Sequence, residues 1–163
     1  MSLHFILDGY NIIRRIPKLD SDNLRQSRKN LVDFIIKYQP QGSSRNGLTI
    51  VFDGKADILY HKDVSNIRII FSEGESADDL IVSIILKSVN KKNICLVSDD
   101  RGLISRIDGL GVKVYSVSDF VSRTGVFKKN KLAQDNKSIL GYSQIEKINR
   151  ELKGIWLDSN NSG

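Results

Sequence analysis

Residues 3–11 read LHFILDGYN, an apolar run followed at once by an acid, a glycine, a tyrosine and an amide. The run from Leu3 to Leu7 is apolar enough to be a strand buried on both faces, as the strands of parallel sheets are. Asp8 and Gly9 end this strand, and the segment that follows is helix-like. An acid and an amide this close to a strand end are typical of a functional site, and we expect Asp8 and Asn11 to belong to one.

The remaining chain alternates between strand-like and helix-like segments. Strands are predicted over 48–52, 66–71, 94–97 and 112–117, and helices over 24–38, 78–89, 101–110, 118–122 and 142–152. The helix over 118–122 is expected to be capped by Ser118, and the helix over 24–38 by a residue within 20–22. This alternation predicts an α/β fold with a parallel sheet that carries helices on both faces.

The helix expected over 24–38 is amphipathic, because its apolar residues repeat at helical spacing. Its buried face is predicted to comprise Leu24, Leu31, Phe34, Ile35 and Tyr38. Its other face is predicted to carry Arg25, Arg28, Lys29 and Lys37.

Acids recur at places that match Asp8. Asp53 and Asp100 come just after strands, Asp99 precedes Asp100, and Asp78 and Asp79 open the helix after the third strand. In open parallel sheets, sites lie outside the carboxyl ends of the strands. We therefore expect Asp8, Asp53, Asp78 and Asp100 to face one edge of the sheet.

Each of these acids, taken singly, is more often a helix cap or a turn residue than part of a site. Asp78 can simply cap the helix that it opens, and Asp53-Gly54 is an ordinary turn signal. Several carboxylates at matching places favour a cation site instead, because converging carboxylates repel one another and hard divalent ions prefer oxygen ligands. The chain offers no Cys/His set for zinc, so Mg²⁺ or Mn²⁺ is the expected ion. Such an ion activates water for attack on a phosphodiester.

Composition places further bounds on function. The chain has 163 residues, which suits one domain, and a formal net charge of +6, which favours an anionic partner such as nucleic acid. A basic soluble surface explains this charge equally well. The single cysteine, Cys95, lies in an apolar run and is expected to be a core thiol. No signal peptide and no membrane span are recognisable, so the expected location is the cytoplasm.

Four motifs in order give the chain a family resemblance: Asp8-Gly9-Tyr10-Asn11, Val51-Phe52-Asp53-Gly54, Glu75-Ser76-Ala77-Asp78-Asp79 and Val97-Ser98-Asp99-Asp100. With them the chain resembles the NYN branch of the PIN-like nuclease superfamily, and most closely its YacP-like bacterial ribonucleases. The resemblance implies a three-layer α/β/α sandwich and a divalent-metal-dependent endoribonuclease acting on RNA. The match spans about residues 3–121, and we expect a nuclease core over 1–122. The basic composition and the helical spacing that follow predict a basic arm and a C-terminal helix over 123–163 that complete the same domain. The basic stretch 123–137 reads equally well as a solvated linker.

The resemblance assigns roles to residues of this chain. Asp8, Asp78 and Asp100 match the catalytic acids and metal ligands, and Asn11 matches the family asparagine, which supports catalysis and reaches the phosphate or water. Asp53, Asp79 and Asp99 are weaker metal candidates, and Arg14 and Arg15 are candidates for guiding the RNA backbone. PIN-like sites often carry a further acid just after the Ser/Thr-x-Asp motif, but residues 101–104 contain none. One firmly held ion is therefore expected.

Other functions compete with this interpretation. An RNA- or ribosome-associated binding module with weak or no nuclease activity, acting on a ribosome or another RNA–protein assembly, also fits the basic charge and the missing acid. A phosphatase with Asp8 as nucleophile is disfavoured, since the common type needs an acid at the position of Tyr10. The absence of a GxGxxG motif and of a Walker A motif argues against a dinucleotide enzyme and against an NTPase.

Overall fold

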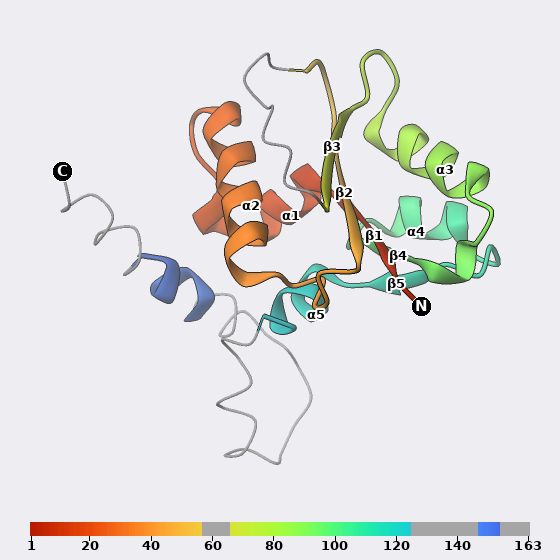
Figure 1. The fold of residues 1–163 in the computed structure, drawn as a ribbon. Coiled ribbons are helices and arrows are strands. Elements are labelled where there is room, and N and C mark those ends of the chain that lie inside the picture. The colour runs from red at the N-terminus through yellow and green to blue at the C-terminus, as the bar shows by residue number, and fades with distance from the viewer. Residues whose placement is uncertain (57–65, 125–146, 154–163) are drawn as a thin grey trace.

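The computed structural model describes residues 1–56, 66–124 and 147–153 (Figure 1). Five parallel strands form one sheet in the order β3-β2-β1-β4-β5. Their bounds are His4–Asp8 for β1, Gly47–Phe52 for β2, Ile67–Phe71 for β3, Ile94–Val97 for β4 and Lys113–Tyr115 for β5. The predicted α/β fold with a parallel sheet is thereby confirmed.

Helices follow the strands. They are α1 (Gly9–Arg15), α2 (Leu24–Tyr38), α3 (Ala77–Lys87), α4 (Arg101–Ile107) and α5 (Val117–Ser122), with short 3₁₀ turns at Pro17–Leu19 (η1) and Lys91–Asn93 (η2). Residues 147–153 are also helical. No helix of the described residues is long and apolar enough to cross a membrane.

Two hydrophobic cores lie on opposite faces of the sheet. Successive residues of a strand point to opposite faces, so Phe5 and Leu7 enter one core and Ile6 enters the other. Helices α1, α2 and α5 cover the first face, where Ile148 and Leu152 of the helical segment 147–153 also pack. Helices α3 and α4 cover the second face (Figure 1). The result is a three-layer α/β/α sandwich.

Several local predictions were wrong. Strand β5 ends at Tyr115 because Ser116, not Ser118, caps α5 by accepting a hydrogen bond from the amide of Asp119. Helix α2 begins after Asn23, which caps it in place of a residue within 20–22. The basic arm predicted over 123–137 lies largely outside the described residues.

The two faces of α2 were also assigned incorrectly at two positions. Arg28 is buried, with 8% of its surface exposed, whereas Leu24 is 59% exposed. Arg28 lies three residues before Leu31 and seven before Ile35, so helical spacing alone puts it in the apolar stripe. The positive charge of Arg28 suggested solvent, but its position determines its burial.

Gly9 is needed for packing and not for a tight turn. It is the first residue of α1, and it is absent from the glycines with positive φ. A Cβ atom at Gly9 would lie 2.6 Å from Cδ1 of Phe52 and closer still to Cε1. The Phe52 ring is fully buried against the rings of Tyr10 and Phe71, so it has little room to move away.

We predict that Gly9→Ala lowers the free energy of unfolding by about 1–3 kcal/mol, because overpacking of the Phe52 ring outweighs the better helix propensity of alanine. Chemical denaturation of the two proteins measures this difference. Adding Phe52→Leu to Gly9→Ala should cost less than the sum of the two single substitutions, because the smaller side chain makes room for the methyl group. An unchanged midpoint for Gly9→Ala alone would contradict this role of Gly9.

Candidate functional site

Asp8 is the buried acid at the centre of the carboxyl edge of the sheet. It ends β1 and caps α1, since its Oδ1 accepts a hydrogen bond from the amide of Asn11 at 3.3 Å. Only 8% of its surface is exposed. Burial raises its pKa from 3.8 to about 6, with the nearby carboxylates of Asp78 and Asp100 adding to the rise. Hydrogen bonds from the Asn11 amide and the Ser98 hydroxyl oppose that shift.

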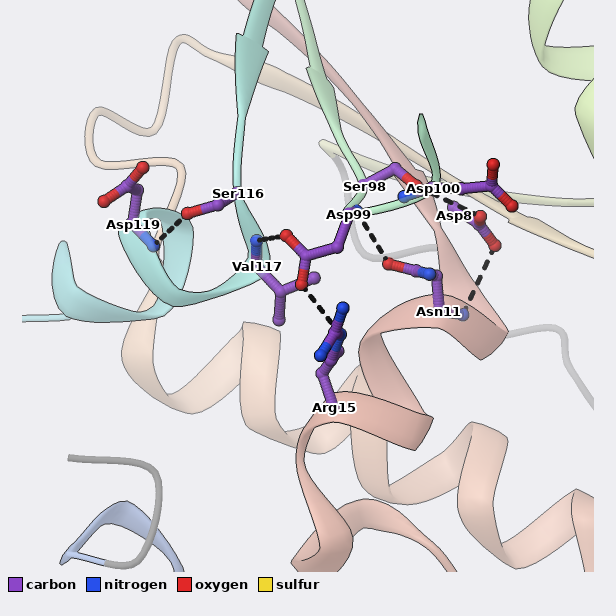
Figure 2. A network of polar contacts seen from close by, with 9 residues as sticks. All are labelled: Asp8, Asn11, Arg15, Ser98, Asp99, Asp100, Ser116, Val117 and Asp119. Carbon is purple, nitrogen blue, oxygen red and sulfur yellow. Dashed lines mark hydrogen bonds and ion pairs between the residues drawn. The ribbon is translucent and has the colours of Figure 1, made fainter. Parts of the chain in front are cut away.

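Asp100 is held next to Asp8 by Ser98. The Ser98 hydroxyl donates to Oδ2 of Asp8 at 3.4 Å and accepts from the amide of Asp100 at 3.1 Å. Asp100 also caps α4, with its Oδ1 accepting from the amide of Leu103 at 3.1 Å. This cap is why the turn after β4 leads directly into a helix. Asp100 lies at the sheet edge beside Ser98 and Asp8 (Figure 2).

Asp78 lies in the first turn of α3, which covers the same face of the sheet as α4. The alternative that Asp78 caps this helix is wrong, because the cap is Ser76. Partial burial raises the pKa of Asp78, and the Asp100 carboxylate raises it further, while the Arg106 guanidinium lowers it. Asp8, Asp78 and Asp100 therefore lie close enough for the charge of one to affect the others.

The three weaker acid candidates make other contacts. Asp53 accepts a hydrogen bond from the Ser72 hydroxyl at 2.9 Å and so ties the end of β2 to the turn before α3. Asp79 is exposed, and its pKa is lowered by the hydrogen bond from Ser76 and by the Arg106 guanidinium, with which it pairs at 2.7 Å. These contacts brace the turns that carry the central acids.

Asp99, the third of these weaker candidates, contacts two neighbouring segments through its backbone amide and its carboxylate (Figure 2). Its amide donates to Oδ1 of Asn11 at 2.9 Å, and its own Oδ1 accepts from the amide of Val117 at 3.1 Å. Its Oδ2 pairs with Nε of Arg15 at 2.9 Å. We refer to these contacts of Asp99 with Asn11, Arg15 and Val117 as the Asp99 latch. They join α1, the turn after β4 and the start of α5.

The latch gives Asn11 and Arg15 structural roles that the sequence did not predict. The Asn11 side chain holds the backbone that leads into Asp100, and Arg15 neutralises Asp99. Arg14 is exposed on α1. Binding of RNA by Asn11, Arg14 or Arg15 stays a prediction.

The donor chemistry at this edge fits a hard divalent cation. Asp8, Asp78 and Asp100 offer only oxygen ligands, and their mutual repulsion is the kind that a bound cation relieves. Within the described ranges 1–56, 66–124 and 147–153, however, no three acidic, histidine or cysteine side chains are gathered closely enough to form a metal centre. Ligation by these three acids is therefore a proposal that rests on their chemistry and proximity.

Comparison with known proteins places the chain in a family. The model of the YacP-like NYN domain matches residues 5–157. The chain belongs to the YacP-like NYN family. This is a nuclease family, and the match confirms the family resemblance inferred from the sequence. No curated protein matches the sequence.

Two crystal structures share the YacP-like NYN fold of this chain. Rae1 (YacP) from Bacillus subtilis superposes with a TM-score of 0.62 at 19% identity, covering 99% of this chain and 89% of Rae1. A mutant of the same protein gives a TM-score of 0.60 at 22% identity, covering 79% of this chain and 78% of the mutant. At these identities the likeness establishes the fold alone.

Sequence reasoning missed two serines at this YacP-like site. Ser98 joins Asp8 to Asp100, and Ser72 anchors Asp53. Ser98 is the first residue of the Ser/Thr-x-Asp motif, so the motif itself contained the signal. Ser72 had no comparable signal, because its partner lies 19 residues away in sequence.

Asp8→Asn should stabilise the metal-free protein at neutral pH. The folded state binds the Asp8 proton more tightly than the unfolded state, so the wild type loses stability as pH rises from about 3.8 to about 6. Asparagine keeps the capping oxygen but carries no charge to bury. In EDTA at pH 7 the variant should gain up to about 3 kcal/mol in unfolding free energy, and the gain should vanish below about pH 4.

Denaturant titrations across this pH range measure the effect. The matched control is Asp33→Asn, which removes a half-exposed acid paired with Lys29 on α2 and should change stability little. An Asp8→Asn protein that is less stable than the wild type at pH 7 would show that burial does not dominate the energetics of Asp8.

Asn11→Ala should loosen the turn that carries Asp100, because the amide of Asp99 loses its acceptor. Hydrogen exchange at residues 99–103 is expected to accelerate, and the affinity for Mn²⁺ to fall about 10–100-fold, as is usual when a group supporting a metal ligand is removed. Asn23→Ala, which removes the cap of α2, serves as the control because it leaves the latch intact. Unchanged hydrogen exchange at residues 99–103 would refute this role of the Asn11 side chain.

Proposed function

We propose that this YacP-like NYN domain is a divalent-metal-dependent endoribonuclease that uses Mg²⁺ or Mn²⁺. The observation that carries the proposal is that Asp8, Asp78 and Asp100 lie at the carboxyl edge of the sheet within electrostatic reach of one another, in a chain of net charge +6. Membership of a nuclease family supports it. RNA as substrate comes from the family resemblance.

The residues of the site have different proposed roles. Asp8, Asp78 and Asp100 would hold the ion, which supplies an activated water and stabilises negative charge on the phosphoryl group. Ser98 keeps Asp8 and Asp100 at a fixed spacing, and the Asp99 latch fixes the backbone between them. The raised pKa of Asp8 favours its protonated form at mildly acidic pH, where the carboxyl group is a poorer ligand.

The proposal predicts that cleavage of single-stranded RNA requires both the ion and the acids. EDTA should abolish cleavage and Mn²⁺ or Mg²⁺ should restore it, while Asp8→Asn, Asp78→Asn and Asp100→Asn should each slow it by at least about 10²-fold. Asp33→Asn should cleave at the wild-type rate. Gel analysis of an end-labelled RNA measures the rates and shows whether the cuts are internal.

The second candidate is an RNA-binding module with weak or no nuclease activity, acting on RNA presented by the ribosome. The observations that favour it are the absence of an acid at 101–104 and the absence, among the described residues, of three acidic, histidine or cysteine side chains gathered into a metal centre. RNA binding that is indifferent to Mn²⁺, together with no cleavage, would establish this module and overturn the nuclease. Cleavage by Asp8→Asn at the wild-type rate would instead overturn the assignment of Asp8 as a metal ligand.

A further inference from the structure

Arg28 is a buried cation beside the proposed active site. It lies in the apolar stripe of α2 and is only 8% exposed. Burial of a charged group is costly unless the group is paired or otherwise compensated. The partners of Arg28 therefore show what this position is built for.

Three aromatic rings and one hydroxyl surround the guanidinium. Its Nε donates to the Tyr10 hydroxyl at 2.8 Å. Its central carbon lies 5.0 Å from the ring centroid of Phe71 and 5.6 Å from those of Tyr10 and Phe52. Such cation–π contacts offset part of the desolvation and hold the planar group in one orientation. We refer to Arg28, Tyr10, Phe52 and Phe71 as the Arg28 cluster.

The two terminal nitrogens of Arg28 have no hydrogen-bond partner among the described residues. Within those residues no carboxylate pairs with Arg28 either. The stem of Arg28 and the ring-facing surface of its guanidinium are held by Tyr10, Phe52 and Phe71. A buried guanidinium whose Nη groups lack a partner in the described protein is a candidate binding group for an anion.

The Arg28 cluster flanks the carboxylates on the side opposite the Asp99 latch. Tyr10 is two residues after Asp8, and Phe52 directly precedes Asp53 and packs under Gly9. Phe52 and Phe71 end β2 and β3, whereas the latch lies at the ends of β4 and β5. A strand that crosses the sheet edge over Asp8 would pass the cluster on one side.

We propose that Arg28 binds a backbone phosphate of the RNA, next to the phosphate that is cleaved. The inference rests on the proposed function and extends it to a substrate-binding residue. The two Nη groups donate to two phosphate oxygens, a planar fork that lysine does not offer. Tyr10 positions the fork through Nε. Because the contact is to the backbone, it fixes the register of the strand without selecting its bases.

Binding of a short single-stranded RNA to the Asp8→Asn protein tests Arg28 separately from cleavage. Adding Arg28→Gln should weaken binding about tenfold and lower the slope of log Kd against log salt by about 0.7, the value for one phosphate contact of a single strand. Arg28→Lys should recover only part of the affinity. The matched control is Lys29→Gln, which removes one exposed charge of the same helix and should leave Kd within about twofold.

A neutral phosphate identifies the contact itself. In a set of RNAs with one methylphosphonate each, one position should weaken binding to the Asp8→Asn protein, and that penalty should disappear when Arg28→Gln is added. Tyr10→Phe, which keeps the ring and loses the hydroxyl, provides a second variant if Arg28→Gln does not fold, as judged by circular dichroism. It should weaken binding less and reduce the penalty at the same position.

Position-specific coupling between Arg28 and one phosphate would support the proposal. Equal losses for Arg28→Gln and Lys29→Gln, or a methylphosphonate penalty that survives Arg28→Gln, would overturn it. The cleavage assay reports independently on the proposed function. Coupling without cleavage would refute the nuclease and keep the phosphate contact, whereas cleavage without coupling would refute the contact alone.

Discussion

The burial of Asp8 beside other carboxylates, at one end of a parallel sheet, is the constraint on which this structure depends. Asp8 is almost fully buried, and its raised pKa reports the cost of charging it there. Asp78 and Asp100 approach it from helices on the same side of the sheet and increase that cost. Carboxylates repel one another, so a fold that keeps them near each other must hold each of them through contacts with other residues.

Those contacts come from short polar side chains and backbone amides. Ser98 links Asp8 to Asp100, Ser72 ties Asp53 to the turn before α3, and Asn11 holds the amide of Asp99. Each is a hydrogen bond that joins segments far apart in sequence or fixes a turn. Acids around the site therefore fall into two groups. Asp8, Asp78 and Asp100 are the acids proposed to hold a cation, and Asp53, Asp79 and Asp99 are engaged in bracing the turns.

Aromatic packing supports the sheet edge at the ends of β2 and β3. The absence of a side chain at Gly9 lets the Phe52 ring lie against α1, and that ring in turn forms one wall around Arg28. The glycine of the first motif thus connects the metal candidate Asp8 to a buried cation. A polyanion that reaches the carboxylates would meet positive charge on one side and a neutralised Asp99 on the other.

The sequence by itself determined the alternation of strands and helices, the parallel sheet and the three acids at its edge. These follow from local hydrophobic period and from chain order, which is why β4 and α2 have the predicted bounds. Only the tertiary structure decided which residues these acids contact. Asp99 meets Arg15 and Val117, and Asp53 meets Ser72, across distances in sequence that no local pattern encodes. Arg28 illustrates this division most clearly. Its position in the helix indicated burial. Only the tertiary structure brings the rings of Phe52 and Phe71 from two strands to the guanidinium, where they offset the cost of burying its charge.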